Sequence, residues 1–262
     1  MVAIASPERA ELHVSASQIK TYMLCPRKYQ LRYVLGAPPE HRSIHLAFGS
    51  AIHEALAAYY MGLRGNAEPP SLDHLCDVFT DSMTSFFDSD LPIDIPQGQS
   101  QEDIQNLGIA LLGVFHADID PPQTVLAVEQ PFAIDICDPT TGQVLEEQLI
   151  GFLDALVEID GKTVIVEHKT AGRKWSQDQL DHDLQTSIYL AAIKADHLRL
   201  QTLVKTTTPK LHIYDLVRTP AQKQEAIKII CGVLTAIRAG AFWPQRGWMC
   251  RGCEFSKACA EM

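Results

Sequence analysis

Two runs of alternating apolar residues, joined by Asp160-Gly161, constrain the fold of this chain more than any other feature. Asp-Gly between such runs is a strong signal for a two-residue type I′ turn in a β-hairpin. With that turn, Asp154 in the first run lies directly opposite Glu167 in the second. The chain is therefore expected to build a sheet around an antiparallel pair of strands.

Charged side chains converge on one face of this hairpin. Directly opposed residues hold their Cβ atoms about 5 Å apart, so the two carboxylates repel each other unless something lies between them. Alternation places Lys169 on the same face as Glu167. A solvated strand face is the alternative interpretation, but Phe152, Leu156 and Ile165 share this face. Two carboxylates and a lysine in such a setting indicate a divalent-metal hydrolase site.

The rest of the chain predicts an α/β fold: a mixed central sheet flanked by helices, in one domain over residues 1–262. A mostly helical part is expected over residues 14–120, the sheet-bearing core over 121–219, and a last helix with a cysteine segment over 220–262. Strands are expected at residues 124–136, 144–159, 163–169, 200–205 and 210–217. Helices are expected after a capping box at Ser15 and at residues 27–35, 46–61, 72–87, 102–115, 183–195 and 220–238.

Several classes of protein are excluded by what the sequence lacks. No apolar run approaches the roughly 20 residues that a membrane-spanning helix needs. Residues 1–12 carry three charged side chains and lack the apolar centre of a signal peptide. We therefore expect a cytoplasmic protein with no membrane partner.

The formal net charge of −10 is unevenly distributed along the chain. Between Gly65 and Gly161 there is no Lys or Arg, whereas 19 of the 32 Asp and Glu residues fall there. All 22 basic residues lie outside this span. A chain polarised in this way can present a basic face to nucleic acid, although the acidic middle also fits a plain soluble helical surface.

Four of the seven cysteines are arranged for metal binding. Cys250, Cys253 and Cys259 follow a Cys-x2-Cys-x5-Cys pattern near the end of the chain, and Cys25 lies near its start. Four thiolates suit zinc or an iron–sulfur cluster. Spacing does not choose between these two, and the chemistry of thiolate sites alone favours zinc. Cys76, Cys137 and Cys231 lie in apolar-periodic segments and are expected to be small buried residues.

Taken together and in order, these features resemble the RecB-like branch of the PD-(D/E)XK nucleases, and are similar to the AddB nuclease domain, CRISPR-adaptation nucleases and stand-alone phage or plasmid nucleases. Each motif alone is weak, but the ordered set is specific. The matching residues are Ser15, Ser17, Cys25 and Pro26; Gly49 and His53; Gly151 and Asp154; Glu167 and Lys169; Gln185 and Tyr189; and the three C-terminal cysteines.

The resemblance implies a restriction-endonuclease-like core and a set of roles. His53, Asp154, Glu167 and the backbone carbonyl of His168 would bind Mg²⁺ or Mn²⁺, with Lys169 orienting the attacking water. The family typically joins its two chain ends through a four-iron four-sulfur cluster, which here would bind Cys25, Cys250, Cys253 and Cys259. That implication places the cluster ahead of zinc.

Further residues are assigned more loosely. Gln185 and Tyr189, one helical turn apart, would hold the DNA strand near the metal by analogy with the family. An equal and compatible alternative is that Tyr189 packs its helix against the sheet. His168 occupies a place where the family often has an aliphatic residue, and its side chain should point to the opposite sheet face. Glu129 on the preceding strand is a further acid near the site. Candidate phosphate contacts are Lys28, Arg32, Arg173, Lys174 and Arg251, although for any single one of them a solvated surface position is the favoured interpretation.

The function expected from the sequence is a metal-dependent DNA nuclease, an exonuclease on single strands or DNA ends, in recombination, repair or CRISPR-type adaptation. The alternative is a non-catalytic DNA-binding or structural subunit of a larger nuclease, adaptation or defence complex. Both alternatives name DNA as the partner, together with other proteins of such a complex.

Overall fold

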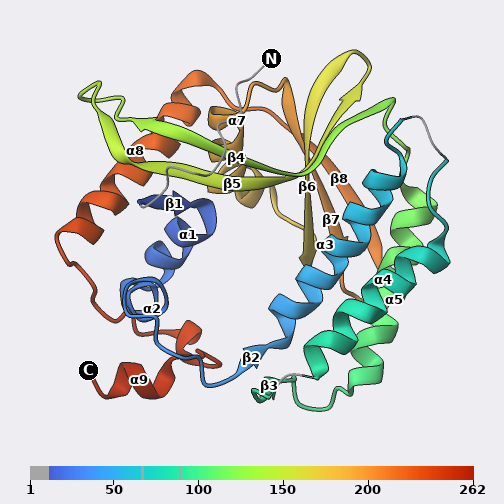
Figure 1. Cartoon of the computed structure of the whole chain (residues 1–262), viewed down its shortest axis with the longest axis horizontal. Coiled ribbons are helices and arrows are strands. Elements are labelled where there is room, and N and C mark those ends of the chain that lie inside the picture. Colours follow the sequence, from blue (N-terminus) through green and yellow to red (C-terminus); the bar gives the residue numbers. More distant parts are fainter. Residues whose placement is uncertain (1–11, 66–67, 89) are drawn as a thin grey trace.

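A mixed β-sheet lies at the centre of the protein, as seen in a computed structural model that describes residues 12–65, 68–88 and 90–262 (Figure 1). Its strands run in the order β1-β5-β6-β7-β8, with β4 along the other edge of β5. The pairs β1–β5 and β6–β7 are parallel and the others antiparallel. The strands are β1 (His13–Ser15), β4 (Thr124–Cys137), β5 (Val144–Ile159), β6 (Lys162–Ala171), β7 (His197–Val204) and β8 (Lys210–Leu216).

The hairpin predicted from the sequence is formed by β5 and β6. Asp160 and Gly161 have φ values of 51° and 71°, the two left-handed residues of a type I′ turn. Pairing with β6 ends at Ala155–Val166. Earlier in β5, the same edge pairs instead with β1, at Gln148 to Ile150. The two hairpin strands therefore separate at Asp154, and we call this point the fork.

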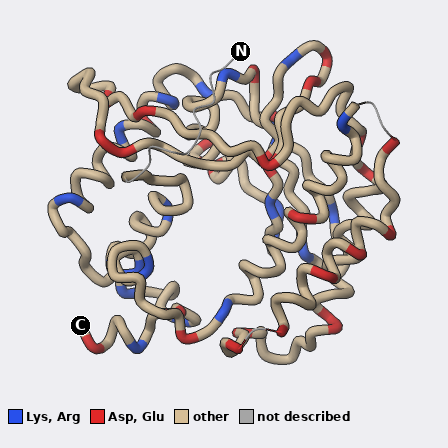
Figure 2. Tube along the Cα trace, viewed as in Figure 1, with Lys and Arg blue, Asp and Glu red and all other residues tan. Residues whose placement is uncertain are grey.

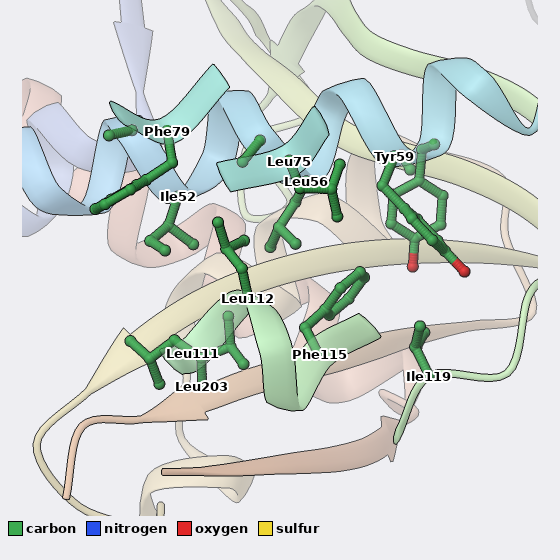
Figure 3. Packing of buried hydrophobic residues seen from close by; sticks show 14 of the residues in the cluster. Ile52, Leu56, Tyr59, Leu75, Phe79, Leu111, Leu112, Phe115, Ile119 and Leu203 are labelled. Carbon is green, nitrogen blue, oxygen red and sulfur yellow. The ribbon is translucent and has the colours of Figure 1, made fainter. Parts of the chain in front are cut away.

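Helices cover the sheet in two groups, one against each face. Successive residues of β6 show the division, because Val164 and Val166 enter one core and Ile165 enters the other. The first core lies under α3 (Ile44–Gly62), α4 (Leu72–Phe87) and α5 (Gln101–Asp118), and Figure 3 shows its packing. The second lies under α1 (Ala16–Leu24), α2 (Pro26–Tyr29), α7 (Leu184–Ala192) and α8 (Pro220–Arg238). The expected class, a mixed sheet flanked by helices, is confirmed.

Helix α3 has one apolar face and one face of small and polar residues. The apolar face recurs at the helical spacing and is at most 1% exposed: Ala51, Ile52, Ala55, Leu56 and Tyr59. The other face is half-buried or exposed: Gly49, Ser50, His53, Glu54 and Ala57. Burial of the first face against α4, α5 and the sheet fixes the second face, and His53 with it, toward the fork.

The segment beyond α8 packs against α1 and α2. The predicted capping box at Ser15 begins α1, and Pro26 begins α2 directly after Cys25. The segment beyond α8 returns to these helices, because Tyr22 Oη donates to Ala241 O at 2.6 Å and Arg27 N donates to Trp243 O at 3.1 Å. This contact brings the C-terminal cysteines to Cys25.

Some elements differ from the sequence expectation. The strand β1, the short helices α6 (Gln177–Asp181) and α9 (Ser256–Ala260), the 3₁₀ turn η2 (Trp248–Cys250), and the paired β2 (Arg42–Ser43) and β3 (Ile93–Asp94) were not expected. The expected helix over residues 27–35 becomes α2 followed by the π-helical turn η1 (Gln30–Val34). Helix α7 ends at Ala192 because Ile193 is extended.

Two expectations concern the ends and the membrane. The absence of a signal peptide was expected from residues 1–12, of which residues 1–11 lie outside the described part of the chain. Within residues 12–65, 68–88 and 90–262, every helix is too short or too polar to cross a membrane.

Candidate functional site

Asp154 lies at the fork, where the strand that carries it leaves β6. Its Oδ2 accepts a hydrogen bond from the backbone N–H of His168 at 2.7 Å. Its Oδ1 lies 3.4 Å from His53 Nδ1, which comes from the small-residue face of α3. A helix and two strands thus bring their functional groups to one point.

Glu129 joins this point from β4. The neighbouring pairs Val128–Ala155 and Gln130–Leu153 place it opposite Asp154, and it has a left-handed φ of 45° that non-glycine residues rarely adopt. Ligand atoms of His53, Glu129 and Asp154 all lie within 4.8 Å of one another. The sequence had placed Glu129 only loosely near the site. The register across the β4–β5 pair was the signal that would have located it.

Glu167 follows on β6, buried with only 3% of its surface exposed. Its Oε1 accepts hydrogen bonds from Lys169 Nζ and from Gln185 Nε2, the latter at 2.6 Å. Its Oε2 has no hydrogen-bond partner and is buried. An ionised oxygen that is buried without a partner destabilises the folded state unless a cation approaches it.

Lys20 extends this network on the side away from Glu167. Its Nζ lies 3.2 Å from Gln185 Oε1 and 3.1 Å from Asp183 Oδ1, the N-cap of α7. No sequence signal predicts this contact, because it depends on how α1 packs against α7.

The charges at the site depend strongly on burial and on one another. Burial raises the pKa of Glu167, and Lys169 only partly offsets this effect. For Asp154, burial is outweighed by His53 and by the His168 N–H, so the pKa of this carboxyl is lowered. The pKa of Lys169 is raised despite burial, because Glu167 lies beside it. The site therefore holds one firmly ionised carboxylate and another that needs a neighbouring cation to stay ionised.

These residues fit a divalent cation. The carboxylate oxygens of Asp154, Glu129 and Glu167 are ligands that suit Mg²⁺ and Mn²⁺, and His53 adds one imidazole nitrogen. Glu167 Oε2 is buried without a hydrogen-bond partner, and the ligand atoms of His53, Glu129 and Asp154 lie within 4.8 Å of one another, so both places offer donors to such an ion.

Two of the predicted residues are packed rather than exposed to solvent. Tyr189 is 7% exposed and sits edge-on against Phe132, with ring centroids 5.6 Å apart. The ring of His168 points to the face opposite Glu167, as expected, and lies 5.4 Å from that of Tyr60. Burial lowers the pKa of His168 to about 3, so the ring is neutral. Phe152, expected on the buried face, is instead 57% exposed, because pairing with β6 ends before it.

A groove along α3 leads to the site. One cavity of about 530 Å³ is lined by Gly49, His53 and Glu129, among others. A second of about 550 Å³ continues it toward Arg42 and the C-terminal segment. The two share the lining residues Leu46, Ser50 and Glu54, and we call them together the α3 groove. A Cβ added at Gly49 would meet nothing within 4 Å.

The four cysteines predicted to act together line one smaller cavity of about 100 Å³: Cys25, Cys250, Cys253 and Cys259. Cys25 comes from the end of α1, and the others come from the returning C-terminal segment. Of the remaining three, expected to be buried, Cys76 and Cys231 are half-buried and Cys137 is exposed at the end of β4.

The basic residues proposed as phosphate contacts have different surroundings. Lys28 Nζ lies 2.8 Å from Glu254 Oε2, and Arg32 lies 3.9 Å from the same carboxylate, so both are paired within the protein. Arg173, Lys174 and Arg251 are exposed and form no ion pair with any described residue.

Comparisons with known proteins give a family match and one similar fold. A family model described as the PD-(D/E)XK nuclease superfamily matches residues 13–260. The crystal structure of a candidate exonuclease from Eubacterium rectale has a TM-score of 0.55 at 15% identity, covering 98% of this chain and 92% of that one. The structure of SSO0001 matches with a TM-score of 0.40 at 17% identity, covering 90% of this chain and 94% of that one. No curated protein sequence matches the chain.

Proposed function

The chain belongs to the PD-(D/E)XK nuclease superfamily, and from this premise we propose that it is a DNA nuclease dependent on Mg²⁺ or Mn²⁺. We propose further that it acts as an exonuclease on single strands or DNA ends. The observation that carries the proposal is the convergence of His53, Asp154, Glu167 and Lys169 at the fork.

The chain's own groups have distinct parts in this reaction. His53, Asp154 and Glu167 Oε2 would hold the cation, with Glu129 and the carbonyl of His168 as further donors. A bound divalent ion polarises a phosphate oxygen and lowers the pKa of bound water. The ammonium of Lys169, held by Glu167, would stabilise negative charge that builds on the phosphate. Gln185 keeps Glu167 in place, and the buried Tyr189 packs α7 against β4.

The α3 groove is the proposed route of the DNA strand. Its walls come from α3, from Ser82 and Ser85 of α4, and from Glu254 and Phe255 near the C-terminus. A passage bordered by distant parts of the chain suits a flexible single strand better than a stiff duplex. The groove lining itself is mixed in charge, with Arg32 and Arg42 beside Glu54, Glu129 and Glu254. Further acidic residues follow α4 and α5 in Figure 2.

The cysteine cavity supports a second part of the proposal, a four-iron four-sulfur cluster. Cys25 and the three C-terminal cysteines line this one cavity although they come from distant parts of the sequence. Four thiolates suit such a cluster, with zinc as the alternative.

A cleavage assay tests the enzymatic proposal directly. Purified protein is incubated with end-labelled single-stranded and double-stranded DNA, with and without Mn²⁺, beside an Asp154→Asn variant. We expect single strands to be shortened from an end only when Mn²⁺ is present, and only by the unsubstituted chain. DNA binding without cleavage would instead support the alternative of a non-catalytic subunit.

Reversing two exposed charges should weaken DNA binding. Arg173 and Lys174 follow β6, whose end lies near the start of α3: Lys205 N donates to Ala171 O, and Lys205 Nζ is 5.1 Å from the Phe48 ring. Replacing both with Glu should lower affinity on the order of tenfold at low salt and reduce its salt dependence. Fluorescence anisotropy with labelled single strands measures both effects.

The matched control is the same double reversal at Lys223 and Lys228, which lie on α8 and also form no ion pair with a described residue. This variant should bind as the unsubstituted chain does. Equal losses in the two variants would show that net charge, rather than a DNA path beside the α3 groove, sets the affinity.

A further inference from the structure

Lys20 joins α1 to α7 on the far side of Gln185 from the metal-binding carboxylate. Its Nζ is 3.2 Å from Gln185 Oε1, while Gln185 Nε2 is 2.6 Å from Glu167 Oε1. Lys20 is therefore one side chain away from Glu167 and does not touch it. Its own side chain is 39% exposed, so the ammonium is still partly hydrated.

The chemistry of the three groups fixes the amide in one orientation. An ammonium can only donate hydrogen bonds, and an ionised carboxylate can only accept them. Gln185, lying between the two, must turn its oxygen to Lys20 and its NH₂ to Glu167. Without Lys20 the amide oxygen loses its charged donor, and the NH₂ group is free to turn away from Glu167.

The orientation of the amide determines which oxygen of Glu167 remains free. Gln185 and Lys169 both donate to Oε1, and this leaves Oε2 buried without a partner. If Gln185 turned away, the carboxylate would be held by Lys169 alone and could rotate. Groups that hold a metal ligand in place typically contribute about 10- to 100-fold to metal affinity or activity.

We propose that Lys20 is a positioning residue of the nuclease site, which sets the amide of Gln185 and through it the metal-binding oxygen of Glu167. The inference rests on the proposed function. It also ties the site to the cysteine cavity, because Lys20 lies on α1 and Cys25 is the C-cap of that helix.

The test compares three single variants, Lys20→Met, Lys20→Arg and Gln185→Ala. It also includes the double variant that combines Lys20→Met with Gln185→Ala. Mn²⁺ affinity is measured by calorimetry, and cleavage rates are measured at saturating Mn²⁺. We expect Lys20→Met to lower Mn²⁺ affinity about tenfold, and Lys20→Arg to restore most of it. In the Gln185→Ala background, Lys20→Met should have no additional effect.

Asp183→Asn tests whether Lys20 acts through Gln185 on Glu167, which we call the relay, or only anchors α1 to α7 through its ion pair with Asp183. Asn is also a good N-cap, so the helix start is kept while the ion pair with Lys20 is lost. We expect wild-type Mn²⁺ affinity for this variant. A loss as large as that of Lys20→Met would mean that Lys20 acts through Asp183, and the relay would be wrong.

The remaining outcomes separate the two proposals. An unsubstituted chain that binds Mn²⁺ but cleaves no DNA contradicts the proposed function. In that case the Mn²⁺ affinities of the variants still test the relay. Equal Mn²⁺ affinity in the unsubstituted chain and Lys20→Met contradicts the relay alone. Additive losses in the double variant also contradict it, because the two residues would then act independently.

Discussion

Asp154→Asn is expected to abolish DNA cleavage while the fold stays intact. Asn keeps the shape and an oxygen that can accept from the His168 N–H, but it removes the charge that faces His53. Metal ions contribute several kcal/mol to such reactions, and at about 1.4 kcal/mol per factor of ten the loss is on the order of a thousandfold. Lys169→Met should be similarly inactive.

The measurement pairs single-strand cleavage in Mn²⁺ with a thermal melt of each variant. Glu158→Gln is the matched control, the same kind of change four residues further along β5 and beyond the fork. It should cleave like the unsubstituted chain. Full activity in Asp154→Asn and Lys169→Met would show that the fork is not the catalytic site.

Ser at Cys25, Cys250, Cys253 or Cys259 is expected to remove bound iron and lower stability. A centre that links Cys25 to the C-terminal trio closes nearly the whole chain into a loop, which in the chain-entropy treatment of cross-links is worth about 5 kcal/mol. In a domain of this size that corresponds to a fall in melting temperature on the order of 10 °C. Anaerobic purification, iron and sulfide assays and calorimetry measure the effect.

Cys137→Ser is the control for the cysteine series, because Cys137 is exposed on β4 and lies apart from the cavity. It should keep the brown colour that an iron–sulfur cluster would give, and it should keep the melting temperature of the unsubstituted chain. An anaerobically prepared chain that is colourless and carries one zinc ion would contradict the cluster and favour the tetrahedral alternative.

Features set by neighbouring residues could be predicted from the sequence. The type I′ turn at Asp160-Gly161, the capping box at Ser15 and helix α8 from Pro220 to Arg238 are all local, and the structure has them where expected. The hairpin turn also placed Asp154 and Glu167 together at the fork, so the centre of the candidate site could be inferred from local chemistry.

Features set by tertiary packing could not be predicted. The strand β1 is three residues long and exists only because the free edge of β5 accepts it. Lys28 pairs with Glu254, which lies near the opposite end of the sequence. Lys20 likewise meets Gln185 only after α1 packs near α7. None of these contacts has a signal in nearby residues.

Gly49 of α3 lowers the stability of the helix and leaves the α3 groove open. Its backbone is helical and a Cβ there would meet nothing within 4 Å, so neither backbone strain nor close packing requires glycine. A glycine inside a helix costs about 1 kcal/mol relative to alanine. The position lies one turn before His53, on the wall of the α3 groove. A side chain here would stabilise the helix and narrow the groove. Gly49 therefore keeps the α3 groove wide at a cost in helix stability.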